Sequence, residues 1–361
     1  MGALGYYPCA EAGRRAISMN FRFSRRALLG VFTTALLFSS AAQATEAVNV
    51  YSYRQPSLIE PLLKAFTQET GIAVNLIFAE KGLIERMVQE GANSPADVLL
   101  TADVGRLVEA KEKGLSQPVK DDAITRNVPP AFADPDGHWY GLTMRARVAY
   151  VSRERVRQNS MSYEELADPK WKGKICIRSG QHPYNLGLIA AMIARRGEEK
   201  TRDWLKGLKA NLAIKPSGND RSQAKSVFAG ECDIAIANTY YMGKMLTNTE
   251  EPEQQGWAKA VRIVFPASPD MGTHVNISGM LLAKYAPHPE NGKKLMRFLA
   301  GPAAQSLYAE GNFEYPVNPS VHPSEIVRAW GNFVPDTLPI GDIAKYEKRA
   351  SALVDEVGFD D

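Results

Sequence analysis

The sequence contains few of the residues that usually bind divalent transition metals. Its 361 residues include five histidines and three cysteines. The histidines are scattered, with no spacing typical of metal ligands. Zinc and copper sites are commonly built from histidine and cysteine side chains, so neither metal is expected here.

The sequence also lacks a hydrophobic run long enough for a permanent transmembrane helix. Its clearest apolar run, residues 27–40, follows a basic region at 22–26 and precedes the small-x-small sequence Ala-Gln-Ala at 42–44. This order predicts an export signal over residues 1–44, cleaved at its end. Residues 24–29, Ser-Arg-Arg-Ala-Leu-Leu, are also typical of a twin-arginine signal, so the Sec and twin-arginine routes both remain open.

A strong charge of either sign is absent once the predicted signal is removed. The full chain has a formal net charge of +3. Residues 1–44 contribute five arginines and one glutamate, which leaves 38 basic and 39 acidic residues in the exported chain. A net charge of −1 gives no support for a nucleic-acid or polyanion partner.

Cysteine is scarce in the exported part of the chain. Cys9 belongs to the predicted signal, which leaves Cys176 and Cys232. An even number of cysteines in an oxidising compartment permits one disulfide. Each cysteine lies in or beside a β-like segment, so a bridge between neighbouring strands and two buried free thiols are both open alternatives.

What the exported chain does contain is an alternation of strand and helix patterns. Its 317 residues exceed the size at which one hydrophobic core keeps growing, which predicts two lobes. We expect strands at 48–53, 72–78, 96–101, 148–152, 174–178, 233–237 and 275–283, and helices at 57–70, 82–90, 185–196, 198–211 and 220–229. The βαβαβ beginning predicts an α/β fold whose lobes are mostly parallel sheets flanked by helices.

Two consecutive tyrosines, Tyr240 and Tyr241, mark the most informative turn. An apolar run of strand length precedes them and a helix-like segment follows, with Asn238 and Thr239 as possible N-cap residues. Ligands of open α/β sheets usually bind at this kind of strand-to-helix turn. Two phenols in the first helical turn can lean toward one point, although one buried and one exposed tyrosine is the ordinary arrangement.

Other turns bring matching groups to the same strand ends. Arg54 follows the first strand, Tyr184 precedes a helix, and Arg145 lies at an expected crossover between the lobes. A phenol has a pKa near 10, but a trivalent cation holds its deprotonated form, and phenolate oxygen is a hard donor. The tyrosines therefore indicate a ferric-iron site. No Ser-His-Asp set, paired glutamates or histidine-rich set surrounds them, which argues against an enzyme.

Charge counting favours an anion beside the iron. Three phenolates neutralise Fe³⁺ but fill only three of its usual six positions. Carbonate or bicarbonate could fill two more, and the charge of carbonate would be matched by Arg54 and Arg145, whose guanidinium groups suit oxyanions. Gln55, Tyr53 and Asn238 are weaker candidates for hydrogen bonds around this site.

Six segments together resemble the periplasmic ferric-iron-binding proteins of ABC transporters, the ferric-binding or iron-deficiency-induced type. The likeness extends from about residue 48 to residue 319. The segments are 48–54, 90–98, 145–148, 230–241, 272–279 and 314–319, which include Gly-Glu-Cys-Asp-Ile-Ala-Ile-Ala-Asn-Thr-Tyr-Tyr and Glu-Tyr-Pro-Val-Asn-Pro. As a set these motifs are specific to that family.

The resemblance implies a type II, two-lobed binding protein with a ligand cleft between its lobes. One lobe would comprise residues 45–143 plus about 275–320, and the other residues 144–274 plus about 321–361. Tyr184, Tyr240 and Tyr241 would bind the iron. The protein, expected to be a periplasmic monomer, would deliver the iron to an inner-membrane permease powered by a cytoplasmic ATPase.

One departure from the family pattern concerns the first lobe. Many members have histidine or tyrosine where this chain has Gln55 and Pro56. The departure resembles the subgroup that completes the iron sphere with carbonate. A receptor for an organic anion or a polyamine remains the alternative, although the three turns lack the carboxylates that a polyamine requires.

Overall fold

The computed structural model describes residues 46–361. The predicted export signal, with its twin-arginine sequence and cleavage site, lies outside these residues. Within residues 46–361, no helix combines the length and the apolar character needed to cross a membrane.

The chain begins with the predicted βαβαβ unit. Strand β1 (Ala47–Ser52) pairs in parallel with β2 (Ala73–Phe78) and with β3 (Val98–Thr101). Helices α1 (Pro56–Thr70) and α2 (Leu83–Glu90) make the connections. Gly71 ends α1 with a φ of 74°, the left-handed conformation that glycine adopts without a steric penalty.

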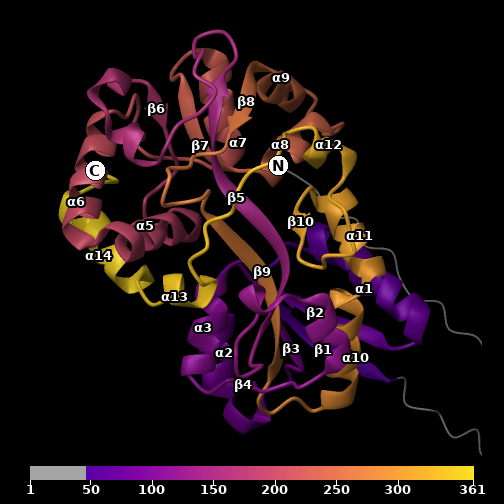
Figure 1. Cartoon of the computed structure of the whole chain (residues 1–361). Coiled ribbons are helices and arrows are strands. Elements are labelled where there is room, and N and C mark those ends of the chain that lie inside the picture. The colour runs from indigo at the N-terminus through magenta and orange to yellow at the C-terminus, as the bar shows by residue number, and fades with distance from the viewer. Residues whose placement is uncertain (1–45) are drawn as a thin grey trace, which may run out of the picture. The chain divides into compact units, whose positions relative to one another are not determined.

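Two long strands connect this unit to the rest of the chain (Figure 1). Strand β9 (Val275–Ala283) pairs antiparallel with β3 and β5. Strand β5 (Tyr140–Ser152) pairs with β9 through its first half and with β7 and β8 through its second half. The strand begins earlier than the predicted 148–152. The prediction missed its first half because that half is buried almost continuously and therefore shows no alternating pattern.

The chain after β5 forms the strands whose ends lead into the turns that hold the tyrosines. Strand β6 (Ile175–Cys176) pairs in parallel with β7 (Ile234–Asn238), and β8 (Val261–Val264) pairs with β5. The helices are α5 (Pro183–Arg196), α6 (Glu198–Ala210), α7 (Asp220–Ala229), α8 (Tyr240–Leu246) and α9 (Glu253–Ala260). A disulfide joins Cys176 to Cys232, so the bridged alternative holds in this structure.

The α/β fold class is confirmed, with one difference in the sheet. Among the described strands, only β1 with β2, β1 with β3, and β6 with β7 pair in parallel. The expectation of mostly parallel pairing is therefore too simple, because β5 and β9 run antiparallel to their partners. The pairing order is β2-β1-β3-β9-β5-β7-β6, with β4 (Ser116–Gln117), β8 and β10 (Tyr315–Pro316) at its sides.

The remaining helices and strands contribute to the apolar clusters around the sheet. They are α3 (Val104–Glu112), β4 (Ser116–Gln117), α4 (Asp122–Asn127), α10 (Pro289–Ala300), α11 (Pro302–Asn312), β10 (Tyr315–Pro316), α12 (Glu325–Arg328), α13 (Ile340–Ala344) and α14 (Glu347–Val357). Helices α1, α10 and α11 bury their apolar faces with β1, β3 and β9. Helices α5, α6 and α14 do the same with the second half of β5 and with β7.

Candidate metal centre

The two consecutive tyrosines lie in the first turn of α8. Strand β7 ends at Asn238, Thr239 precedes the helix, and Tyr240 is its first residue. The Thr239 side chain does not cap the helix; instead its Oγ1 accepts a hydrogen bond from the backbone N of Ala146 at 3.3 Å. Tyr240 is buried and Tyr241 is half-buried, and their ring centroids are 4.2 Å apart. The turn thus presents both phenols together, as the sequence predicts.

Tyr184 joins this pair from another helix. It is the second residue of α5, and His182 caps that helix by accepting a hydrogen bond from the Tyr184 backbone N at 3.2 Å. The Tyr184 hydroxyl is 3.1 Å from the Tyr240 hydroxyl. The structure therefore brings the three predicted metal-binding tyrosines into one cluster.

The environment of the paired tyrosines keeps them protonated when no metal is bound. Burial raises the pKa of Tyr240 well above its usual value, and the neighbouring Tyr184 and Tyr241 raise it further. Burial also raises the pKa of Tyr241, with added contributions from Tyr184 and Asp220. A nearby cation would reverse the preference, because it stabilises phenolate.

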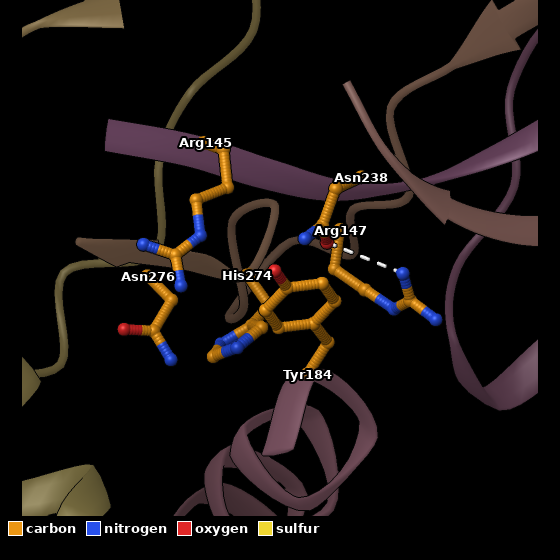
Figure 2. A pocket seen from close by; sticks show the side chains of 6 residues that line it. All are labelled: Arg145, Arg147, Tyr184, Asn238, His274 and Asn276. Carbon is orange, nitrogen blue, oxygen red and sulfur yellow. Dashed lines mark hydrogen bonds between the residues drawn. The ribbon is translucent and has the colours of Figure 1, made fainter. Parts of the chain in front are cut away.

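Three arginines surround the ring of Tyr184. The guanidinium carbons of Arg145, Arg147 and Arg178 lie 5.5, 6.0 and 5.4 Å from the ring centroid. Figure 2 shows Tyr184 extending from α5 toward Arg145 and Arg147. Tyr184 therefore lies close to three cationic groups.

A small polar pocket lies beside Tyr184. Its other lining residues are Arg145, Arg147, Asn238, His274 and Asn276 (Figure 2). Three of these side chains have a buried nitrogen without a hydrogen-bond partner: Arg145 Nη1, Asn238 Nδ2 and His274 Nδ1. Because buried polar atoms are normally hydrogen-bonded, this pocket suits a small polar guest.

Asp220 binds two of the arginines that lie near Tyr184. It is fully buried, and its carboxylate accepts hydrogen bonds from Arg147 at 2.7 Å and Arg178 at 3.2 Å. It also accepts a hydrogen bond from the backbone N of Asn238 at 2.8 Å. Arg147 is therefore paired with a carboxylate, whereas Arg145 has no carboxylate partner among the described residues and donates through Nη2 to the Ala102 carbonyl.

Arg54 has a different partner from the one expected. Its guanidinium donates two hydrogen bonds to the carboxylate of Glu314, at 3.0 and 2.7 Å, and a third to Ser278 Oγ at 2.7 Å. Burial alone would lower the pKa of Arg54, but Glu314 more than offsets it, and the pKa is raised. The charge count from the sequence needs correction here, because Glu314 already neutralises Arg54.

The weaker predicted candidates lie around this centre with separate contacts. The side chain of Gln55 is exposed at the start of α1. The Tyr53 hydroxyl accepts a hydrogen bond from the backbone N of Ile84 at 2.8 Å. Asn238 Oδ1 accepts one from Arg147 at 3.2 Å. Among these three, Asn238 is the one that lines the pocket beside Tyr184.

Two histidines lie close to the tyrosines. The His182 ring contacts Tyr184 edge-on, with centroids 4.5 Å apart. Burial lowers the pKa of His182 to about 3, and Arg178 adds repulsion. Burial likewise lowers the pKa of His274 to about 3. Both rings are therefore neutral at physiological pH.

Several residues of the centre were missed in the sequence. Asp220 and Glu314 pair with arginines, and Arg178 and Arg221 lie over the rings of Tyr184 and Tyr241. Arg178 stands in the same turn as Tyr184 and could have been included on that ground. Asp220, Glu314 and Arg221 had no sign in the neighbouring sequence that they belong to this centre. With Arg54, Arg145 and Arg147, five arginines accompany two carboxylates, so positive charge is in excess.

Within residues 46–361, no group of three or more histidine, cysteine, aspartate or glutamate residues is placed to hold a metal ion. The convergent oxygen donors of this region are the three phenols.

Known proteins resemble the chain over most of its length. Iron uptake protein A1 of Synechocystis is 41% identical, over 94% of this chain and 99% of that protein. The apo ferric ion-binding protein A of Pasteurella haemolytica superposes with a TM-score of 0.84 at 51% identity, covering 88% of this chain and 99% of the other. The Trichodesmium protein IdiA (FutA), solved with iron and citrate, gives a TM-score of 0.82 at 41% identity, covering 87% and 99%.

The family model described as bacterial extracellular solute-binding protein matches residues 93–330. These residues include the three tyrosines and all of β5 and β9. The similar structures confirm the type II binding-protein fold. The chain therefore belongs to the bacterial extracellular solute-binding proteins, and its resemblance to their ferric-iron-binding members is confirmed.

Proposed function

We propose that this chain is the periplasmic solute-binding component of an ABC importer and that its solute is ferric iron. The observation that supports this best is the convergence of three phenols, with the Tyr184 and Tyr240 hydroxyls 3.1 Å apart. The named iron-uptake and ferric-binding relatives support the same reading.

Tyr184, Tyr240 and Tyr241 would bind Fe³⁺ as phenolates. Each phenol gives up its proton to the solvent when the metal arrives, because the trivalent charge outweighs the burial that favours the neutral form. Arg178 and Arg221 lie over two of the rings and stabilise the resulting negative charge. Phenylalanine at these positions would keep the packing but remove the oxygen donor.

A small anion would complete the coordination sphere of the iron. Carbonate or bicarbonate remains our preferred choice, and Arg145 is its best-placed partner because Arg145 Nη1 is buried without an acceptor. Arg54 would contribute only if Glu314 shared or released it. Citrate is present with iron in the structure of the Trichodesmium protein, so it is a second candidate for the anion.

We further propose that the two lobes comprise residues 45–143 plus about 275–320, and 144–274 plus about 321–361. The change of β5 partners near residue 146 supports this division, as does the packing of α14 with α5 and α6. A periplasmic monomer of this kind would deliver iron to an inner-membrane permease driven by a cytoplasmic ATPase.

The test is the colour of the iron-loaded protein. Fe³⁺ bound to phenolate gives a visible charge-transfer band, so the exported chain loaded with iron should be coloured. Tyr240→Phe and Tyr241→Phe should each lose most of this band and weaken iron binding by orders of magnitude. Absorption titration with a ferric chelate measures both effects.

Tyr285→Phe is the matched control. It makes the same chemical change at a tyrosine that is 46% exposed and outside the phenol cluster. Its band and affinity should equal those of the wild type. Full colour in both cluster variants would overturn the assignment of the tyrosines, and a colourless wild type that binds no iron would overturn the proposed function.

A further inference from the structure

A second and larger cavity lies on another side of the helix that carries the tyrosines. Its volume is about 590 Å³, within the range of pockets that hold small organic ligands. Helices α8, α9 and α12 and strand β8 supply most of its walls; Figure 1 shows them in the same part of the molecule. The pocket beside Tyr184 shares none of these walls, since it is lined from β5, α5, β7 and the start of β9.

The walls of this larger cavity are mainly apolar. Met242 and Leu246, one helical turn apart on α8, line it together with Ile326 and Trp330. The exposed Ala329 lies beside them at the end of α12. An apolar wall of this kind favours a ligand with an apolar body, because burial of hydrocarbon surface drives its binding.

The charged groups of this cavity are all positive. Its lining includes Arg153, Lys259 and Arg262 and no aspartate or glutamate. No ion pair joins any of the three to a carboxylate within residues 46–361, although most other arginines there have one.

Arg262 is the best anchored of the three cations. Its Nη2 donates hydrogen bonds to the carbonyls of Val156, at 3.1 Å, and Gln158, at 2.6 Å. Burial lowers the pKa of Arg262, and repulsion from Arg153 lowers it further. An anion bound beside two guanidinium groups that lack a counter-ion reduces the repulsion between them.

From the apolar walls and the unpaired cations, we propose that this cavity binds a small soluble anion with an apolar body, of which a medium-chain carboxylate is the simplest example. The carboxylate would lie against Arg153, Lys259 and Arg262, and the hydrocarbon chain against Met242, Leu246 and Trp330. The proposal does not depend on iron binding.

Calorimetric titration of the iron-free exported chain with decanoate, below its micelle concentration, tests the proposal. Decanoate should bind at one site, while decanol and decyltrimethylammonium should bind at least about tenfold more weakly, since they lack the charge that the cations recognise. Trp330 should report the same binding through its fluorescence.

Two variants separate the charge from the volume of the cavity. Arg153 and Lys259 are exposed, so the double variant Arg153→Gln, Lys259→Gln should fold normally and lose at least about tenfold in decanoate affinity. Ala329→Trp should fill the cavity and abolish binding. The matched control is Lys206→Gln with Lys348→Gln, which removes two exposed lysines elsewhere and should change nothing.

Four results would overturn the proposal, three of which concern how binding occurs. These three are equal binding of the anionic and cationic probes, undiminished decanoate affinity in the double variant, and association with phosphatidylglycerol vesicles without binding of free decanoate. Absence of any decanoate binding would also overturn it. None of these results bears on the colour of the iron-loaded protein, so a failure here is distinguishable from a failure of the proposed function.

Discussion

At the scale of single residues, the centre combines phenols that resist ionisation with arginines that favour it. Tyr240 and Tyr241 have raised pKa values because they are buried beside other phenols. The arginines Arg178 and Arg221 lie over the rings of Tyr184 and Tyr241. Tyr240 and Tyr241 therefore stay protonated when the site is empty and ionise only when a strong cation arrives.

The pH dependence of iron binding follows from the raised pKa values. Tyr240 and Tyr241 are protonated at neutral pH, so ferric iron must displace at least two protons from them. Lowering the pH raises the proton concentration and favours the free protein. We expect the affinity to fall by at least about 100-fold for each pH unit from pH 8 to 6. Titrations in two buffers of different ionisation enthalpy measure the number of protons released.

Tyr240→Phe provides the internal check on this number, because it should release one proton fewer with whatever iron it still binds. An affinity that is the same at pH 8 and pH 6 would contradict phenolate ligation. The chelate that supplies the iron needs its own pH calibration in the same buffers.

At the scale of elements, the position of α8 depends on one close contact. Gly243 lies directly against Phe313, and a Cβ atom at Gly243 would come 2.2 Å from the Phe313 ring. Phe313 has a φ of 57° at the end of α11, the one described non-glycine residue with a positive φ. Tyr240, Phe313 and Val327 form one small apolar cluster, so this contact bears on the first turn of α8.

Gly243→Ala should therefore displace α8 from Phe313. Because the helix spans only seven residues, movement at Gly243 should also shift the tyrosines in its first turn. We expect a loss of stability of roughly 1–3 kcal/mol, typical of an overpacked core, together with weaker iron binding. Denaturant unfolding and the charge-transfer band measure the two effects.

Gly256→Ala is the control for Gly243→Ala, because it makes the same substitution at a glycine in another helix, α9. The nearest atom to its Cβ would be 3.9 Å away, which is ordinary van der Waals contact. This variant should be neutral or stabilised by up to about 1 kcal/mol, since alanine favours the helix over glycine. If Gly243→Ala behaves like Gly256→Ala, the contact with Phe313 does not position α8.

At the scale of the whole molecule, β5 and β9 join two groups of strands, β1 to β3 and β6 to β8. Arg145 and Arg147 lie where β5 changes partners, opposite Asn276 on β9 and Asn238 on β7. A ligand held there would contact residues from both groups of strands. Hinged closure around such a ligand is the usual motion of two-lobed binding proteins.

Closure with iron should depend on the anion. If carbonate bridges Fe³⁺ to Arg145, iron without bicarbonate should leave the lobes apart. Small-angle scattering should then show compaction with iron and bicarbonate together, and little with iron alone. Arg145→Ala should lose this difference and shift the charge-transfer band.

Citrate and phosphate serve as comparison anions in the same experiment, because both are oxyanions that a guanidinium group can bind. Identical compaction and spectra with and without bicarbonate would remove the anion role from Arg145 and Arg54. Gln55, Tyr53, His182 or water would then complete the iron sphere.

The local sequence determined the elements that hold the tyrosines and part of the site itself. The pattern of residues 233–244 predicts a strand, a turn and a helix, and β7 and α8 follow it closely. The limits of α7 and β9 were also predicted from the sequence. Such features depend on neighbours along the chain, through helical period, strand alternation and turn chemistry.

Only the tertiary structure decided which groups neutralise one another. Glu314 pairs with Arg54 across 260 residues, and Asp220 pairs with Arg147 across 73. The antiparallel pairing of β5 with β9 likewise joins distant segments. A carboxylate on the sequence gives no local sign of its partner, because a buried ion pair is selected by the distance between side chains after folding. The oxygen donors of the proposed site could therefore be read from the sequence, whereas its charge balance could not.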